Sequence, residues 1–328
     1  MSKNLFDYAK KELSQDGFLM WLIDSYNDEN EEIKNVSRSF IEFLTGVSKT
    51  EKITEVWVKP QWCKIDVTAF ITTDKKEKIA LFVEDKTMSC EHNQLEAYNR
   101  SIDNIETWEK GKLTKIVKIY YKTSVMEEWE STKVHDAGWK ECTFSKINDF
   151  WTNYKKSSNL IISQYAQHVC KLFDDSNSVS IPAENNIVAW KSYFNKVIYP
   201  KFKDKVSCWV STTRYNYCYF SVRPLGRGDE CMPYLEIRSR DCLNNNFNSK
   251  ILMYGVDFKN NPDGLNEIRN IIRSRENLNI FKGNYGAKQN KQVAHMKKNI
   301  FSQHNDEEFI KNVSLVIDEY LEIVKFWK

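Results

Sequence analysis

The feature that most constrains this chain is an unbroken apolar run, Ile79-Ala80-Leu81-Phe82-Val83, with charged residues on both sides of it. A strand that has one face in water alternates apolar and polar residues, whereas a continuous apolar run is typical of a strand buried on both faces. The run therefore predicts an interior strand of a sheet that helices cover on each side. That layering belongs to the α/β class.

The neighbouring segments supply the partners that such a strand needs. Helical and alternating periodicities predict helices over 5–27, 29–45 and 89–110, and strands over 53–58, 64–72, 78–84 and 113–122. We expect a cap or a break at 14–16 in the first helix, and a strand near 139–144 followed by a helix from 145. The order α-α-β-β-β-α-β indicates an α/β sandwich.

The second half of the chain has a different order of elements. We expect helices over 159–174, 184–198, 263–275 and 306–326, and strands over 206–212, 217–223, 233–239 and 250–258. Strands that precede helices in this way favour a separate α+β domain. At roughly 150 residues per domain, the 328 residues divide into two domains, which we place at 1–155 and 156–328.

The net charge of +3 conceals an uneven distribution. Residues 1–155 carry 23 basic and 27 acidic side chains, whereas residues 156–328 carry 25 and 18. A basic domain attracts a polyanion, so the second half is expected to bind or sense nucleic acid.

The eight cysteines are scattered, and no two lie within four residues of each other. This spacing excludes zinc knuckles and favours free thiols in a reducing compartment. No apolar run approaches the ~20 residues that cross a bilayer, and the first residues do not have the pattern of a signal peptide. We therefore expect a cytoplasmic protein without a membrane partner.

A group of chemically useful side chains lies where the apolar run ends. Side chains alternate along a strand, so Glu84 and Lys86 share one face while Asp85 points to the other. One strand earlier, Asp66 interrupts a β-prone segment. A turn near residue 75 would bring Asp66 opposite Glu84. Two carboxylates can hold Mg²⁺, although an ion pair at the solvent end of a buried strand is the alternative interpretation.

The helix that follows adds a second pattern. Gln94 and Tyr98 are four residues apart, so they share a helix face. Together, Asp66, Glu84-x-Lys86 and Gln94-x-x-x-Tyr98 resemble the PD-(D/E)XK nuclease superfamily, including the Q-x-x-x-Y element of its RecB-like members. The resemblance covers about residues 4–155. It departs from the family at one point, because Ile65 replaces the proline that usually precedes the aspartate.

The resemblance implies a restriction-endonuclease-like core, in which a mixed central sheet is flanked by helices. Asp66 and Glu84 would bind Mg²⁺ or Mn²⁺, joined by Glu12, which matches a helical glutamate of one bacterial branch. Lys86 would assist the attacking water or stabilise the transition state, and Gln94 would contact the phosphate or a metal-bound water. The implied activity is phosphodiester hydrolysis, in DNA rather than RNA, in restriction, phage defence or repair.

Two other classes of function remain open at this stage. One is a non-catalytic protein that binds or senses nucleic acid on a nuclease scaffold, and the other is a nuclease directed at RNA. The sequence leaves the oligomeric state open, a homodimer included.

The weaker candidates each have a plainer interpretation. We expect Asp16 to be a first-turn helix residue and Glu55 to be a surface charge. The triplet Asp257-Phe258-Lys259, with Glu236 one strand upstream, resembles the first triplet, but no glutamine–tyrosine pair follows it.

Two basic segments are candidates for contact with substrate. Residues 282–298 hold five lysines and no acid, which suits either a phosphate-binding loop or a solvated one. The candidate substrate contacts are Tyr98, Lys288, Lys291, Lys297 and Lys298. Residues 199–223 mix cations with aromatic rings, which suits phosphate contact and base stacking, and equally strands with a polar outer face.

Overall fold

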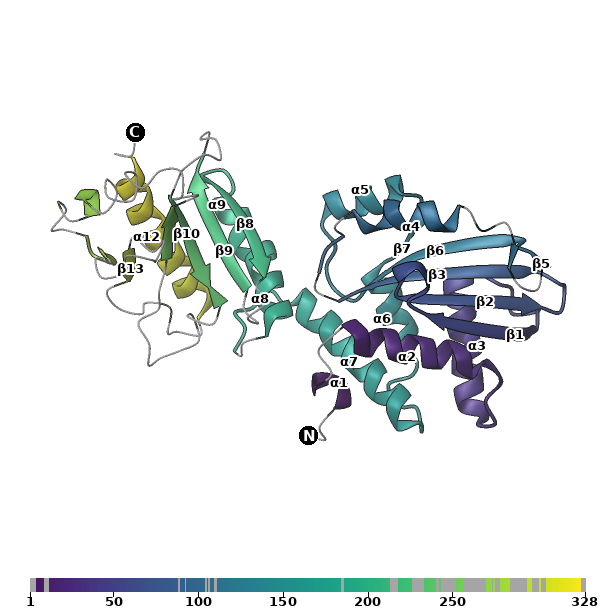
Figure 1. Cartoon of the computed structure of the whole chain (residues 1–328). Coiled ribbons are helices and arrows are strands. Elements are labelled where there is room, and N and C mark those ends of the chain that lie inside the picture. Colours follow the sequence, from purple (N-terminus) through teal and green to yellow (C-terminus); the bar gives the residue numbers. More distant parts are fainter. Residues whose placement is uncertain are drawn as a thin grey trace. The chain divides into compact units, whose positions relative to one another are not determined.

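The computed structural model describes residues 4–8, 12–87, 89–91, 93–103, 105, 107–108, 111–183, 186–212, 218–225, 233–239, 242, 252–255, 270–272, 274, 278–283, 294–296, 301 and 305–325. The chain divides into two compact units, Met1–Asp174 and Asp175–Lys328, and each has a hydrophobic core of its own (Figure 1).

The first unit contains a five-stranded sheet in the order β1-β2-β3-β6-β7. Its strands are β1 (Ile53–Pro60), β2 (Val67–Thr73), β3 (Lys78–Lys86), β6 (Lys115–Lys122) and β7 (Lys140–Cys142). The first three strands are antiparallel neighbours, whereas β6 runs parallel to β3 and β7 runs parallel to β6. The sheet is therefore mixed, and β3 lies at its centre.

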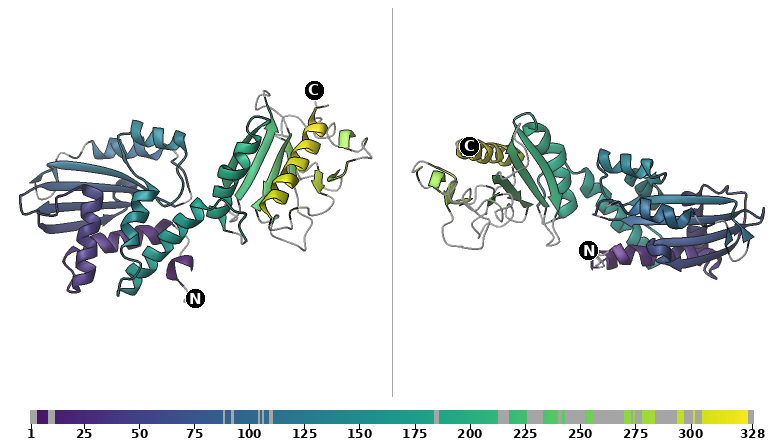
Figure 2. Two further views of the ribbon diagram at one scale, coloured as in Figure 1. Left: turned by 180° about the vertical axis from the view of Figure 1, so that it is seen from behind. Right: turned by 45° about the horizontal axis from the view of Figure 1, so that its top comes forward.

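Helices cover both faces of this sheet, as the apolar run predicts (Figures 1 and 2). Ile79, Leu81 and Val83 pack in one core, and Ala80 and Phe82 pack in another on the opposite face. All five side chains are 0% exposed. The first core is completed by α1 (Leu5–Tyr8), α2 (Glu12–Asp24), α3 (Glu31–Thr45), α6 (Phe144–Thr152) and α7 (Leu160–Asn177), and the second by α4 (Gln94–Ile102) and α5 (Glu128–Asp136).

Local backbone conformation corrects several expected boundaries. The strand expected from residue 64 begins only at Val67, because Cys63 and Lys64 have φ of 54° and 70° in the turn η2 (Trp62–Lys64). The helix expected over 89–110 begins only at Gln94, since Asn93 has a left-handed φ of 63°. It ends at Ile102, after which β4 (Thr107–Trp108) pairs with β5 (Gly111–Lys112).

Two further differences concern helices. The first long helix, α2, continues through residues 14–16 without a break, because Gln15 and Asp16 are buried inside the unit. The periodicity did not predict α5, in which only Glu130 and Val134 are buried. A helix with so few buried residues has no apolar stripe to mark it.

The second unit contains a four-stranded sheet in the order β11-β10-β9-β8, antiparallel throughout. Its strands are β8 (Val206–Thr212), β9 (Cys218–Pro224), β10 (Pro233–Arg238) and β11 (Leu252–Gly255). The described helices are α8 (Ile187–Tyr193), the π-helical η3 (Phe194–Ile198), α9 (Tyr199–Phe202) and α12 (Asp306–Val324), and β12 (Phe281–Gly283) pairs with β13 (Ala294–Met296). Most of the helix expected over 263–275 lies outside the described residues.

The division between the units falls later than the boundary expected at residue 155. The reason is α7, whose Ile162, Tyr165 and Val169 are buried in the core of the first unit. None of the seven described cysteines forms a disulfide. In the part of the chain that the structure describes, no helix is both long and apolar enough to span a membrane.

Candidate functional site

The register of β2 and β3 places Asp66 opposite Glu84. Val67, the first residue of β2, pairs with Val83 in this antiparallel hairpin, so Asp66 immediately before β2 lies near Glu84, the next residue of β3. The turn near residue 75 predicts this pairing. Asp66 is partly exposed whereas Glu84 is only 1% exposed, so the site opens to solvent on the side of Asp66.

The third residue of the sequence pattern, Lys86, lies on the same face of β3 as Glu84. Its Nζ is 2.5 Å from Oε1 of Glu84, and its side chain is 8% exposed. Asp66 and the Tyr98 hydroxyl also lie within hydrogen-bonding reach of this carboxyl. Glu84 is therefore buried at the end of the hairpin with Lys86, Asp66 and Tyr98 around it.

Burial dominates the electrostatics of Glu84. Loss of water raises the pKa of this carboxyl to about 8, the charge of Lys86 lowers it and the charge of Asp66 raises it. Two carboxylates this close cannot both ionise readily. A divalent cation would relieve both the burial penalty and the repulsion, because it supplies positive charge to both groups.

The residue between them, Asp85, supports the site from the opposite face of the sheet. Its peptide N–H donates to Oδ2 of Asp66 at 3.0 Å, and its Oδ1 accepts from Nε2 of Gln15 on α2 at 2.5 Å. Burial raises the pKa of Asp85 well above its usual range, and the nearby carboxyl of Asp16 raises it further. Asp16 is thus a buried partner of Asp85, and the expectation of an ordinary first-turn residue is wrong.

The start of α4 is held by a buried carboxylate. Oε1 of Glu91 accepts from the backbone N–H of Gln94 at 2.6 Å and from that of Leu95 at 3.4 Å. Tyr98 follows one turn after Gln94 and lies near Glu84. Burial raises the pKa of the Tyr98 hydroxyl, and the charges of Glu84 and Asp66 raise it further.

A second buried ion pair lies beside the first, and sequence reasoning missed it. Lys122 pairs in register with Lys86 on the parallel strand β6, and Tyr120 pairs with Glu84. Nζ of Lys122 donates to Oε1 and Oε2 of Glu130 at 2.7 and 2.5 Å. The available signal was a lysine at the end of a strand, directly after the run Ile119-Tyr120-Tyr121.

The donor set fits a divalent cation that retains several waters. Mg²⁺ is commonly bound by one or two carboxylates together with water and substrate phosphate, and Asp66 and Glu84 provide such a pair. Among the described residues, no group of three or more His, Cys, Asp or Glu side chains is arranged to hold a metal. Glu12 begins α2, but its side chain lies outside what the structure describes.

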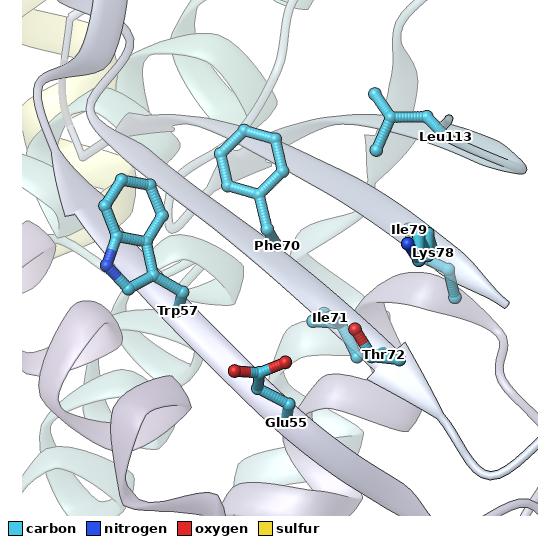
Figure 3. A pocket seen from close by; sticks show the side chains of 8 residues that line it. All are labelled: Glu55, Trp57, Phe70, Ile71, Thr72, Lys78, Ile79 and Leu113. Carbon is cyan, nitrogen blue, oxygen red and sulfur yellow. The ribbon is translucent and has the colours of Figure 1, made fainter. Parts of the chain in front are cut away.

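Other sequence candidates do not join this site. Glu55 lines a pocket with Trp57 and Phe70 (Figure 3). It pairs in register with Thr72, six residues along β2 from Asp66, which corresponds to about 20 Å of strand. In the second unit Glu236 pairs with Arg238 at 2.5 Å. Outside the described residues lie Asp257, Phe258 and Lys259 of the second triplet, and Lys288, Lys291, Lys297 and Lys298 of the basic segment.

The segment 199–223 is described in part. Arg223 lies over the ring of Trp209, with Cζ 4.6 Å from the ring centroid, and Lys205 pairs with Asp318 of α12. Some of the cations and aromatic rings of this segment therefore contact other residues of the second unit.

Comparison of the chain with protein-family models, with curated proteins and with solved structures gives no match.

Proposed function

We propose that this protein is a divalent-metal-dependent nuclease whose first unit is a restriction-endonuclease-like core. The observation that supports this most strongly is the meeting of Asp66, Glu84 and Lys86 at one end of the β2–β3 hairpin, on one face of a mixed sheet. A mixed sheet with helices on both faces is compatible with the core that the resemblance implies. The proposal therefore combines a motif with the geometry that its chemistry needs.

In this proposal each residue has a distinct role. Asp66 and Glu84 hold Mg²⁺ or Mn²⁺, which when bound polarises the phosphodiester and lowers the pKa of a bound water. Lys86 supplies a fixed positive charge beside the carboxylates, where negative charge develops on the phosphate. The Asp85 N–H fixes the orientation of Asp66. Tyr98 on α4 lies near Glu84 and borders the site as a buried wall, and Gln94, one turn earlier on the same helix, is the proposed contact for phosphate.

The proposed substrate is DNA, in a setting of restriction, phage defence or repair, and the basic second unit binds or senses it. Residues 156–328 carry 25 basic and 18 acidic side chains, the opposite balance to the residues that hold the carboxylates. A basic surface supplies affinity for phosphate that does not depend on sequence and that salt weakens.

The experiment that tests the proposal compares cleavage of single-stranded DNA, double-stranded DNA and RNA by the full chain in Mg²⁺, in Mn²⁺ and in a chelator. The variants are Asp66→Asn and Lys86→Met. The matched control is Lys75→Met, which removes the exposed ion pair between Lys75 and Glu51 at the far end of the same hairpin.

We expect metal-dependent cleavage by the wild type and by Lys75→Met, none by Asp66→Asn, and cleavage slower by about 10²- to 10³-fold by Lys86→Met. Cleavage at the wild-type rate by both site variants would exclude this site. Salt-sensitive DNA binding without cleavage by the wild type would favour a binding or sensing protein, and cleavage restricted to RNA would change the substrate class.

A further inference from the structure

We infer that the buried pair Lys122–Glu130 positions the proposed site, because it anchors the loop from which α4 begins and thereby sets where α4 places Tyr98 near Glu84, with Gln94 one turn before it. This inference rests on the proposed nuclease function. It adds Lys122 of β6 and Glu130 of α5 to the residues that support the proposed site. Neither residue touches the carboxylates that would hold the metal, so both are positioning residues.

Both members of the pair are buried, and Glu130 accepts several hydrogen bonds. Glu130 is 0% exposed and Lys122 is 1% exposed. Oε1 of Glu130 accepts from the Tyr120 hydroxyl at 2.6 Å and from the Glu91 backbone N–H at 3.0 Å, in addition to Lys122. Burial opposes the charge of Glu130, but the hydrogen bonds from Lys122 and Tyr120 hold the pKa of this carboxyl below its usual value.

Both partners fasten the same short loop. Glu130 holds the N–H of Glu91, and Nζ of Lys122 donates to the carbonyl of Ser89 at 3.1 Å. This loop connects β3, which carries Glu84 and Lys86, to α4, which carries Gln94 and Tyr98. The loop thus has two anchors on elements that lie outside the segment it connects.

The loop transmits this fixation to α4 through the side chain of Glu91. Its Oε1 accepts from the N–H groups of Gln94 and Leu95, which have no partner within the helix because they belong to its first turn. Asn93 precedes the helix with φ of 63° and does not cap it through its side chain. The start of α4 therefore depends on Glu91, and Glu91 depends on Glu130.

Stability alone does not account for such a pair. Apolar side chains of similar volume commonly stabilise a core as well as a buried ion pair does, because two charges lose their water on burial. Hydrogen bonds from fixed charges are directional, so they can hold the loop in one conformation, which apolar packing does less specifically. The structure places that loop beside the proposed metal site.

The test uses the full chain with Glu91→Ala, Glu91→Gln and the double variant Lys122→Met/Glu130→Gln. The matched control is Glu32→Ala. Glu32 is a carboxylate of the same unit that also holds a helix connection, since its Oε1 accepts from the Ser158 N–H at 2.9 Å and the Ser157 hydroxyl at 2.7 Å. Two readouts are measured for each variant: amide hydrogen exchange across α4 and the kinetics of DNA cleavage.

For Glu91→Ala we expect faster exchange at Gln94 and Leu95 and a kcat lower by roughly 10- to 100-fold, the scale of a small misplacement of reacting groups, with KM little changed. The double variant keeps an acceptor oxygen for the Glu91 N–H but loses the contact of Lys122 with the Ser89 carbonyl, so it should change both quantities in the same direction by less. Glu91→Gln keeps an acceptor oxygen, so its kcat and its exchange rates at Gln94 and Leu95 should be close to those of the wild type. Glu32→Ala should leave kcat and the exchange of α4 unchanged. In a Gln94→Ala/Tyr98→Phe background, Glu91→Ala should add little further loss, because the groups it positions are gone.

Unchanged amide exchange in Glu91→Ala would overturn the inference. So would a full further loss of kcat when Glu91→Ala is added to the Gln94→Ala/Tyr98→Phe background. A wild type that cleaves no nucleic acid would instead refute the proposed function, and hydrogen exchange would still decide whether Lys122 and Glu130 hold α4 through Glu91.

Discussion

At the scale of single residues, the proposed chemistry depends on a carboxylate that the fold has taken out of water. Glu84 is 1% exposed, and Lys86 is 2.5 Å from one of its carboxylate oxygens while the like charge of Asp66 lies nearby. A group buried in this way is poorly stabilised until a cation arrives. Asp66, which is half-buried, gives that cation a route.

Lys86→Met tests whether the lysine acts in catalysis. Removal of one fixed positive group at a developing negative charge costs about 10²- to 10³-fold in kcat. We expect that loss for Lys86→Met in the cleavage assay, together with unchanged affinity for DNA, since Lys86 is 6% exposed and offers little surface to the duplex. A kcat within a factor of about two of wild type would exclude a catalytic role.

The raised pKa of Glu84 predicts how stability depends on pH. Between its ordinary pKa of 4.5 and about 8, this carboxyl is protonated in the folded state and ionised in the unfolded state. Because the folded state binds more protons, the free energy of unfolding falls as pH rises through this range, by up to about 1.4 kcal/mol per pH unit. Asp85 contributes with the same sign.

The measurement is urea unfolding of the metal-free protein from pH 5 to pH 8, beside Glu84→Gln. The variant should show a shallower fall in the free energy of unfolding. Added Mn²⁺ should stabilise the wild type more at pH 8 than at pH 6, because the metal requires the ionised carboxyl. Identical pH profiles for the two proteins would refute the assignment of Glu84.

At the scale of elements, sequence reasoning succeeded where one physical signal dominated. The apolar run identified β3, and the turn near residue 75 set the register that joins Asp66 to Glu84. It failed for α5, whose two buried residues include a glutamate. Lys122 and Glu130 were missed for the same reason, since their importance comes from a parallel pairing and a helix that no local pattern marks.

The ion pair between β6 and α5 makes a prediction about stability. Lys122→Met leaves the carboxylate of Glu130 buried without its main partner, and such a loss costs about 3–5 kcal/mol. The double variant Lys122→Met/Glu130→Gln removes both charges and should recover most of that free energy of unfolding in urea titrations. A double variant no more stable than the single one would show that the charges themselves stabilise the unit.

At the scale of the whole molecule, the proposed function assigns catalysis to the first unit and attraction of the nucleic acid to the second. The candidate site lies entirely within Met1–Asp174, and the excess of basic residues lies in the second half of the chain. The sequence predicted two domains, but the boundary required three-dimensional packing, because the apolar residues of α7 could serve a core on either side.

Truncation tests this division. A fragment of residues 1–177 keeps Ile162, Tyr165 and Val169, which are 0% exposed in the core of the first unit, and should unfold cooperatively. A fragment of residues 1–155 loses them and should be unfolded or strongly destabilised. We expect the longer fragment to bind DNA more weakly and with a smaller salt dependence than the full chain. Equal thermal stability of the two fragments, measured by circular dichroism, would contradict the role given to α7.

The central claim is that Asp66 and Glu84 hold a metal that cuts a phosphodiester. Its most direct test measures the initial rate of DNA cleavage against Mn²⁺ concentration for the wild type and for Asp66→Asn. The account predicts a wild-type rate that rises with Mn²⁺ and saturates, and an Asp66→Asn rate that stays at background throughout. A wild type without cleavage at any Mn²⁺ concentration, or an Asp66→Asn protein that matches it, would contradict the account.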